Sequence, residues 1–467
     1  MTSTSTTSPL NMADENSKKR NFYFSVWRWH FYAGLYVIPF ILLLSITGLI
    51  MLFNDSIEQL QHDEIINITP QHHTYSVAEQ RLNVQNLYPN ASIKQYITPV
   101  NSTTSSRFSI VKASGQGVYV LVNPYTGAIL GEIHRDNSWY RLANDIHGTL
   151  LIGDVGDRMI EIAASLSILL IVSGLYLWWP KDAKSRASFF TLRFSSGTKA
   201  VIKDLHSNLG AIFSLFLLFF LISGLAWAGV WGGKFVQPWS SFPAEKWDDV
   251  PLSTQTHNTL NHGVEEEVPW NLELTHLPLS TEQPESSGVV NVDRIVELAY
   301  AEGFTRFKLN FPKDEQSVYT VSANTMSGDI TDARDDRTTH IDQYSGKVLA
   351  DVTWQDYSVM AKFMAAGIAL HQGDMGLWNL IANTLLCVVF IFVAISGVMM
   401  WWSRKPYGLA TLASPIKPKA ISASLPAIIT VITLCLLFPM AGMTIATVLL
   451  FDLMVVARSQ RLQKFFH

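Results

Sequence analysis

The chain has 467 residues, of which 48% are hydrophobic and 15% are charged, and 34 Lys and Arg against 38 Asp and Glu give a net charge of −4. The charged share is well below the roughly 25% of soluble proteins, and no basic excess is present to neutralise the phosphates of a nucleic acid. The two cysteines, Cys387 and Cys435, both lie in apolar segments. The composition therefore excludes a nucleic-acid-binding protein, a disulfide framework and a cysteine zinc site.

Long apolar runs dominate the chain. Four of them reach the roughly 20 residues that a helix needs to cross a bilayer; they are residues 33–53, 159–179, 209–230 and 377–402. A fifth run is too long for one crossing and is interrupted by Pro439 and Gly442, which predicts a hairpin of two short helices. The sequence thus predicts an α-helical membrane bundle of four core helices plus a C-terminal hairpin, six transmembrane helices in all.

The segments between these helices complete the predicted organisation. Residues 54–158 and 231–376 combine a helix-like stretch with strand-like runs, which predicts two small α+β domains outside the membrane. Residues 1–20 are rich in Ser, Thr and Asn and are predicted to be disordered. The predicted boundaries are transmembrane helix 1 at 21–53, external domain 1 at 54–158, helix 2 at 159–179, a loop at 180–203, helix 3 at 204–230, external domain 2 at 231–376, helix 4 at 377–402, a loop at 403–420, the hairpin at 421–457 and a tail at 458–467.

Basic residues near the membrane ends predict the orientation. Lys and Arg concentrate before the first apolar run, between the second and third, after the fourth and in the tail, which assigns these segments and both termini to the cytoplasm. A tail with Arg458, Arg461 and Lys464 agrees with an even number of crossings. The first apolar run lacks a small-residue cleavage signal, so we expect a retained anchor.

The two halves of the chain carry the same pattern, which indicates a repeated unit of helix, external domain and helix. In the external domains, residues 122–131 resemble residues 341–350. His147 and His371 each precede a Gly-Asp-x-Gly motif and a helix that closes on Ser-Gly and Trp-Trp pairs. The motif begins six residues after His147 but two residues after His371, so the repeat alone leaves the depth of His371 open.

One histidine stands at the start of each core helix. His30 and His206 enter from the cytoplasmic side, and His147 and His371 from the outer side. Ionisable residues at membrane depth are costly and usually face the bundle interior, and two neutral imidazoles from two helices are the arrangement that holds the iron of a b-type haem. The pattern predicts two haems b, an inner one on His30 and His206 and an outer one on His147 and His371. The alternative is that all four are interfacial residues bound to backbone or headgroups.

Glycines are predicted to make room for the haem edges. Eighteen residues at about 100° per residue complete five turns, so Gly48 lies on the same face as His30, roughly 27 Å along the helix. The predicted haem-facing glycines are Gly34, Gly48, Gly210, Gly224, Gly174 and Gly397. Candidate partners for the haem propionates are Arg28, Arg141, Arg158 and Lys203, although basic residues at helix ends also extend toward the interface by themselves.

Other polar residues support weaker hypotheses. Glu161 and Asn383, inside the second and fourth helices, are expected to be interhelical hydrogen-bond partners. The remaining histidines considered as metal ligands are expected to be solvated loop residues; they are His72, His73, His257, His262 and His276.

Together these motifs resemble the PepSY-associated transmembrane proteins, a group of bacterial iron-regulated membrane proteins that includes ferric-siderophore reductases of the ferrioxamine type. The resemblance extends from Trp27 to Arg458. It rests on Trp29-His30, Asp204-Leu205-His206, Ile146-His147, Leu370-His371, the two Gly-Asp-x-Gly motifs and the closing Ser-Gly and Trp-Trp pairs. It implies PepSY-like periplasmic domains on a multi-pass protein of the bacterial inner membrane.

The resemblance also implies an activity. It predicts a dihaem oxidoreductase that reduces a periplasmic ferric siderophore and releases Fe(II), because the hard oxygens of siderophores hold Fe(III) far better than Fe(II). No flavin or nicotinamide fingerprint occurs in the chain, so the electron donor is expected to be a separate quinol or cytoplasmic reductase. The other expected partner is membrane lipid. Two alternatives remain open: a non-enzymatic PepSY module that binds a periplasmic partner, and a transporter of metal or an iron chelate.

Overall fold

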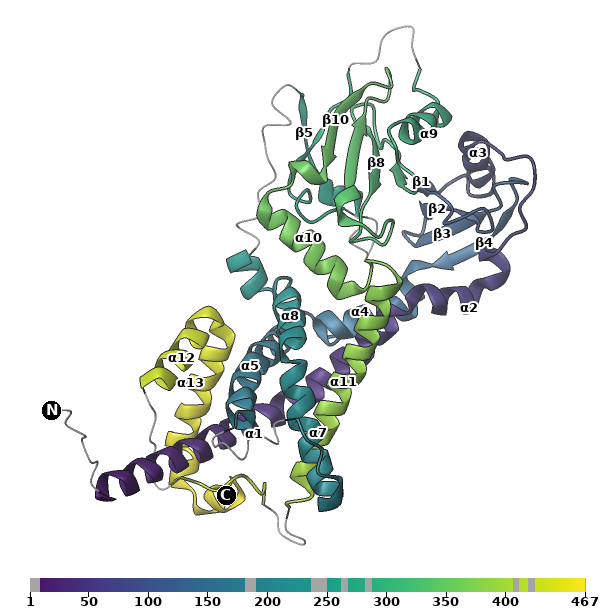
Figure 1. Ribbon diagram of the computed structural model, residues 1–467. Coiled ribbons are helices and arrows are strands. Elements are labelled where there is room, and N and C mark those ends of the chain that lie inside the picture. The colour runs from purple at the N-terminus through teal and green to yellow at the C-terminus, as the bar shows by residue number, and fades with distance from the viewer. Residues whose placement is uncertain are drawn as a thin grey trace, which may run out of the picture. The chain divides into compact units, whose positions relative to one another are not determined.

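The computed structural model describes residues 9–180, 190–236, 250–261, 268–281, 288–405, 411–418 and 425–466. Parts of the predicted cytoplasmic loops, of the second external domain and of the start of the hairpin lie outside these residues, as does His262. The chain divides into two compact units, whose elements are labelled in Figure 1. The helical unit comprises Met1–Thr47, Ile146–Gln237 and Thr384–His467, and the sheet unit comprises Gly48–Asp145 and Pro238–Asn383.

Four described helices are long and apolar enough to cross a membrane, and a bent pair adds a fifth. They lie in α1 (Pro9–Leu52), α5 (Asp154–Trp178), α11 (Leu377–Trp402) and, with the turn that follows it, α13 (Pro439–Met454). The bent pair is α7 (Thr198–Ile212) and α8 (Ser214–Leu225). The prediction of a multi-pass membrane protein is confirmed.

The third predicted helix is broken rather than continuous. α7 and α8 meet at Phe213 with a bend of 57°. At the break the hydroxyl of Ser214 donates to the carbonyl of Ala211 at 2.7 Å. A hydroxyl that bonds to the preceding turn offers the backbone an alternative to regular helix, and apolar periodicity does not reveal such a break.

The C-terminal hairpin is present, with its break where proline predicts it. α12 (Leu425–Leu437) and α13 are separated by one residue, Phe438, and Pro439 is the first residue of α13. Trp231 stacks on Phe438 at this turn, with 5.8 Å between ring centroids. The 13 residues of α12 extend only about 20 Å, less than the roughly 30 Å of a bilayer core. Six full crossings therefore remain a prediction.

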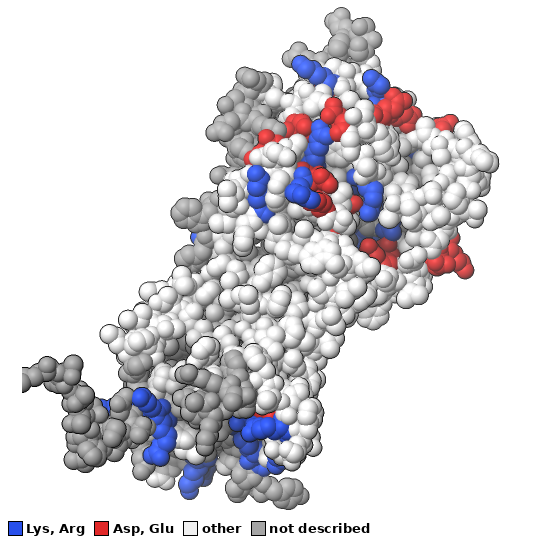
Figure 2. Space-filling model, in the orientation of Figure 1, with Lys and Arg blue, Asp and Glu red and all other residues white. Residues whose placement is uncertain are grey.

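The basic segments predicted to be cytoplasmic converge at one end of the helical unit. Figure 2 shows Lys and Arg gathered at that end, beside a largely uncharged surface. The Arg28 guanidinium donates to Ser414 at 3.0 Å, Tyr32 donates to the carbonyl of Phe466 at 2.9 Å, and Lys199 donates to the carbonyl of Ser403 at 3.5 Å. α1 begins at Pro9, so part of the N-terminal segment predicted to be disordered is helical; proline is favourable in a first helical turn.

The two external segments share one antiparallel sheet of eight strands, where the sequence predicts two separate domains. Its order is β10-β9-β8-β7-β1-β2-β3-β4. The strands are β1 (Ser92–Ile97), β2 (Ser106–Val111), β3 (Gly117–Val122), β4 (Ile129–His134), β7 (Lys308–Asn310), β8 (Tyr319–Ala323), β9 (Arg337–Ile341) and β10 (Val348–Thr353). The halves join where β1 pairs with β7, for example at Tyr96 and Leu309. Separate domains would each have two edge strands, and the β1 to β7 pairing leaves only β4 and β10 at the edges of the shared sheet.

Each half of the sheet is preceded by one helix, as the repeat predicts. α3 (Val77–Leu87) precedes β1, and α9 (Val292–Ala301) precedes β7. Val84 and Ile295, one from each helix, are fully buried against the same core as Phe108. The amide of Ala78 donates to the Asp293 carboxylate at 2.9 Å, which joins the two helices directly.

The repeated turns also agree. The turn between β3 and β4 and the turn between β9 and β10 both contain a glycine with φ of +68°, Gly127 and Gly346. The side chain of Asn123 in the first turn and that of Asp342 in the second each accept a hydrogen bond from the amide two residues later, at 2.9 Å.

The remaining helices and strands are α2 (Asn54–Ile66), α4 (Trp139–Thr149), β5 (Leu252–Thr256), β6 (His276–Pro278), α10 (Val359–Gln372) and α14 (Gln460–Phe466).

Candidate functional site

Two predicted ligands, His30 and His206, lie in one ring of four helices in the helical unit. His30 of α1 is hydrogen-bonded through Nδ1 to the hydroxyl of Ser173 on α5 at 3.0 Å. His206 of α7 is hydrogen-bonded through Nδ1 to the hydroxyl of Ser396 on α11 at 2.9 Å. Each histidine therefore joins the first helix of its half to the second helix of the same half.

Contacts between the halves close the ring. The indole of Trp178 on α5 donates to Asn208 on α7 at 3.0 Å. A Cβ placed on Gly397 of α11 would lie 3.5 Å from Ile38 of α1, and the Arg404 guanidinium lies 5.1 Å from the ring centre of Trp27 on α1. α1, α5, α7 and α11 thus surround a common interior that receives both histidines.

The hydrogen bonds fix the tautomer of both rings. The hydroxyls of Ser173 and Ser396 donate their single hydrogen to helix carbonyls, those of Leu169 at 2.7 Å and Val393 at 2.9 Å. Each hydroxyl can therefore only accept from the histidine, so Nδ1 carries the proton. His206 gives the same result independently, because its Nδ1 lies 3.0 Å from the carbonyl of Val393, which is an acceptor only. Among the described residues neither Nε2 has a hydrogen-bond partner, and both rings are partly exposed.

His147 has the same arrangement. It lies near the end of α4, and its Nδ1 is 2.8 Å from the hydroxyl of Thr47 on α1. The Thr47 hydroxyl donates to the carbonyl of Leu43 at 2.8 Å. The Nδ1 of His147 therefore also donates, and its Nε2 is likewise left available.

His371 is held through its backbone. It is the second-last residue of α10, and the Asn383 amide donates to the carbonyls of Leu370 at 2.8 Å and His371 at 3.0 Å. Asn379 also donates to the carbonyl of Leu370, at 3.0 Å. These amides satisfy carbonyls at the end of α10 that have no partner within their own helix. His147 belongs to the helical unit and His371 to the sheet unit.

The structure corrects the alignment of the Gly-Asp-x-Gly motifs. Gly153 directly precedes α5, and the residue that directly precedes α11 is Gly376, not Gly373. All three glycines have positive φ, but Gly153 and Gly376 stand at the start of a helix, whereas Gly373 caps the end of α10. Measured to these equivalent glycines, His147 and His371 are six and five residues away. The apparent mismatch in the repeat is therefore one residue rather than four.

Two predicted glycines face the histidine rings themselves. A Cβ on Gly174 would lie 3.1 Å from Cε1 of His30, and a Cβ on Gly397 would lie 3.6 Å from Cε1 of His206. A Cβ on Gly34 would lie 4.0 Å from Leu170, and a Cβ on Gly210 would meet nothing within 4 Å. Gly48 lies partly exposed in α1, and Gly224 lies exposed in α8.

The candidate propionate partners mostly have protein partners. Arg28 donates to Ser414, and Arg141 forms an ion pair with Asp145 at 2.6 Å. Arg158 contacts Asp157 at 2.5 Å and Glu161 at 3.4 Å. Lys203 is exposed on α7.

Glu161 and Asn383 are hydrogen-bond partners between elements, as predicted. The Glu161 carboxylate is 1% exposed and accepts the amides of Val230 at 3.1 Å and Trp231 at 2.9 Å. It thereby satisfies the backbone beyond α8. Asn383 has the corresponding role for α10.

One prediction about the other histidines is wrong. His72, His73 and His276 are exposed, but His257 is fully buried, with its Nε2 2.9 Å from Nε2 of His340. The carbonyl of Thr275 lies 2.8 Å from Nδ1 of His257, and the Thr320 hydroxyl lies 2.9 Å from Nδ1 of His340. Burial lowers the pKa of His257 to about 4 and that of His340 well below its usual value. Local sequence missed this pair because its members lie 83 residues apart.

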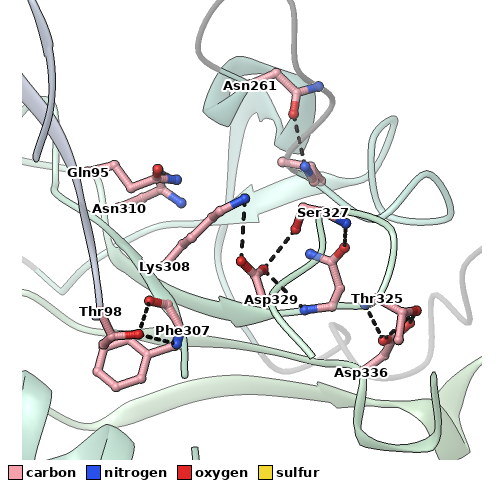
Figure 3. A network of polar contacts seen from close by, with 12 residues as sticks. Gln95, Thr98, Asn261, Phe307, Lys308, Asn310, Thr325, Ser327, Asp329 and Asp336 are labelled. Carbon is pink, nitrogen blue, oxygen red and sulfur yellow. Dashed lines mark hydrogen bonds and ion pairs between the residues drawn. The ribbon is translucent and has the colours of Figure 1, made fainter. Parts of the chain in front are cut away.

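A second buried polar cluster lies beside the centre of the sheet (Figure 3). Lys308 of β7 and Asp329 are 9% and 8% exposed, with 3.5 Å between ammonium and carboxylate. Asp329 also accepts from Ser327 at 2.8 Å, and Asp336 accepts the amide of Thr325 at 2.8 Å. Burial raises the pKa of Asp336 to about 7. The cluster fixes the connection between β8 and β9.

No group of three or more His, Cys, Asp or Glu side chains suited to a metal ion occurs in the described ranges.

Sequence reasoning missed the hydroxyls that hold the histidines. Ser173 and Ser396 are the first members of the Ser-Gly pairs, which the sequence analysis used only as markers of the repeat. Their position beside a ring-facing glycine is the signal that identifies them.

Comparison with known families agrees with this architecture. The chain matches the family described as the PepSY-associated TM region over residues 27–404, more than half of its length, and it belongs to that family. A comparison with curated proteins finds no match.

Proposed function

We propose that this member of the PepSY-associated TM region family is a dihaem b electron-transfer protein of the bacterial inner membrane that reduces periplasmic ferric siderophores. The observation that carries the proposal is the inner pair of histidines. His30 and His206 belong to one ring of helices, and each has its Nδ1 proton bound and its Nε2 unshared. Two neutral imidazoles with free Nε2 atoms form the donor set that suits a six-coordinate haem iron.

The surroundings of this pair suit a haem. A buried apolar cluster packs α1 and α5 against α8 and the hairpin, and the ring-facing Gly174 and Gly397 carry no side chain that would displace the imidazoles. Bound haem supplies one-electron chemistry. The chain's own residues orient the imidazoles and keep them neutral. The proposal of an outer pair, His147 with His371, rests on the sequence repeat. It is also supported by the bond from His147 Nδ1 to the Thr47 hydroxyl, which is of the same kind as those of the inner histidines.

The direction and the substrate follow from charge and from the family resemblance. Lys and Arg at one end of the helical unit support a cytoplasmic location for that end. Electrons would enter there from a separate quinol or reductase and leave on the external side. One electron added to the chelated Fe(III) gives Fe(II), which hard oxygen ligands hold weakly, so the iron is released.

An absorption spectrum tests the proposal. Protein purified from haem-replete cells in mild detergent should show a Soret band and, after dithionite, the sharp α and β bands of low-spin b haem. The His30→Ala variant should lose part of this signal, and His276→Ala, which changes an exposed histidine of the sheet unit, should keep all of it. A colourless parent protein would contradict the proposal and favour a binding module or a transporter.

The acceptor is tested separately. Dithionite-reduced protein, freed of excess reductant, should be reoxidised by a hydroxamate ferric siderophore with release of Fe(II) to a ferrous chelator. The gallium(III) complex of the same siderophore cannot take up an electron and serves as control. Equal reoxidation by both complexes would exclude ferric-siderophore reduction.

A further inference from the structure

Three of the four predicted ligand histidines bind the hydroxyl of a residue that directly precedes a glycine. The pairs are Thr47-Gly48 for His147, Ser173-Gly174 for His30 and Ser396-Gly397 for His206. A fourth pair, Ser223-Gly224, follows His206 at the spacing with which Thr47-Gly48 follows His30. The hydroxyls of all four residues donate to helix carbonyls three or four positions earlier, the last of them to Phe219 at 2.8 Å.

We propose that Thr47, Ser173 and Ser396 are positioning residues that hold His147, His30 and His206 in the Nδ1-protonated tautomer, which would leave Nε2 as the nitrogen that binds a haem iron. This inference rests on the proposed function and adds residues that neither the repeat nor the family match assigns. The hydroxyl hydrogen is already used by the helix backbone, so the oxygen can only accept. The proton on the ring is thereby fixed on Nδ1, and Nε2 keeps the lone pair that a haem iron would take.

A hydroxyl suits this role inside a membrane. Histidine ligands commonly donate the N–H of the ring nitrogen that does not bind the metal to a carboxylate, a carbonyl or water. A carboxylate at membrane depth would carry a costly charge, whereas a serine or threonine already bonded to its own helix is neutral. The glycine that follows removes the side chain nearest the ring, since a Cβ on Gly174 would lie only 3.1 Å from the His30 imidazole.

The hydroxyl bond also affects the haem potential. An imidazole that donates from Nδ1 is a more basic ligand through Nε2. A more basic ligand favours Fe(III), so the bond lowers the midpoint potential. Removal of the hydroxyl should raise the potential of the haem bound by that histidine and weaken its retention.

Three substitutions on α5 test the inference. Ser173→Ala removes the hydroxyl, and Ser173→Thr keeps one. Ser167→Ala is the control, because it removes a buried hydroxyl of the same helix. That hydroxyl donates to the carbonyl of Ala163 at 2.7 Å and bonds to no histidine among the described residues. Redox titration and haem-transfer assays on the detergent-solubilised protein should give Ser173→Ala a higher potential for one haem and roughly tenfold weaker retention of it. Ser173→Thr and Ser167→Ala should match the parent.

The outcomes separate this inference from the proposed function. Parent protein that binds haem, with Ser173→Ala unchanged in potential and retention, would overturn the positioning role and leave the dihaem function intact. Parent protein without haem would contradict the dihaem function. In that case ¹⁵N NMR of histidine-labelled, haem-free protein still decides the hydroxyl's role. Nδ1-protonated rings in the parent and a changed tautomer in Ser173→Ala would support it, and identical spectra would overturn it.

Discussion

The two halves of the helical unit hold their histidines by the same two contacts. In the first half, His30 bonds through Nδ1 to the Ser173 hydroxyl and also to the backbone of Leu170, three residues before that serine. In the second half, His206 Nδ1 lies within 3.0 Å of the Ser396 hydroxyl and of the Val393 carbonyl, again three residues before the serine. The repeat therefore conserves both contacts, and the two halves should respond alike to loss of the serine.

The two halves of the sheet unit, in contrast, differ at matched positions. The repeat aligns Leu121 of β3 with His340 of β9, and both are fully buried. Leu121 packs in an apolar cluster with Ile66 of α2. His340 instead meets His257 in a chain of hydrogen bonds. The same strand position is thus apolar in one half and polar in the other, because different segments cover it.

The largest expected effect is on haem binding. His30→Ala and His206→Ala should each remove the same haem and leave the other, because one iron needs both imidazoles. Haem extraction and difference spectra of the two variants measure this. Loss of different haems in the two variants would show that the halves do not share the inner site.

The next largest effect is on stability. It distinguishes Glu161, in the second helix of the first half, from Asn383, in the second helix of the second half. Glu161→Ala leaves the amides of Val230 and Trp231 without their carboxylate and should cost about 3 kcal/mol. Asn383→Ala removes two amide bonds to carbonyls of α10 and should cost about 1.5 kcal/mol. Thermal unfolding in detergent compares the variants. An equal loss of stability would indicate that charge at Glu161 contributes nothing beyond hydrogen bonding.

Acid should affect the second half of the sheet more than the first. His257 and His340 are neutral in the fold because burial lowers their pKa values, His257 to about 4, while an unfolded histidine titrates near 6.5. The contribution of the two neutral histidines to the free energy of unfolding is complete above pH 6.5. It is lost as the pH falls toward 4, because the unfolded chain takes up the protons first, and the loss is at most about 3 kcal/mol for His257. Asp336 acts in the opposite direction. Burial raises its pKa to about 7, so this carboxyl group adds to the free energy of unfolding as the pH falls below 7.

Hydrogen exchange at pH 7 and pH 5, corrected for intrinsic rates, measures the loss of protection in β9 and in β3 separately. We expect the larger loss in β9. The Asp336→Asn variant removes the opposing carboxyl group and should make the acid loss in β9 larger. Equal protection of both strands at the two pH values would contradict the assigned role of the histidine pair.

The smallest effect concerns the ring-facing glycines. Gly174→Ala places a methyl 3.1 Å from His30 and should displace the imidazole, whereas Gly397→Ala places one 3.6 Å from His206, an ordinary contact. Electron paramagnetic resonance of the oxidised protein reports ligand orientation. We expect a shifted signal for Gly174→Ala and little change for Gly397→Ala. A larger shift for Gly397→Ala would reverse the order of the two sites.

Much of the fold could be predicted from the sequence because its signals are local. Apolar length gave the candidate membrane spans, Pro439 gave the hairpin break, and the matched residues around Gly127 and Gly346 gave the repeated turns. The bend at Phe213 and the pairing of β1 with β7 were not predictable in this way. The bend leaves no mark in the apolar pattern, and the pairing joins strands that are more than 200 residues apart in the sequence.

The sequence by itself determined which residues are special: four histidines at matched positions, and glycines at helical spacing from them. Only the tertiary structure decided how three of these histidines are held, because a tautomer depends on which atom faces Nδ1. That atom comes from another helix, 143 residues away for His30, 190 for His206 and 100 for His147. Periodicity identifies the face of a helix, but only packing determines the partner that the face meets.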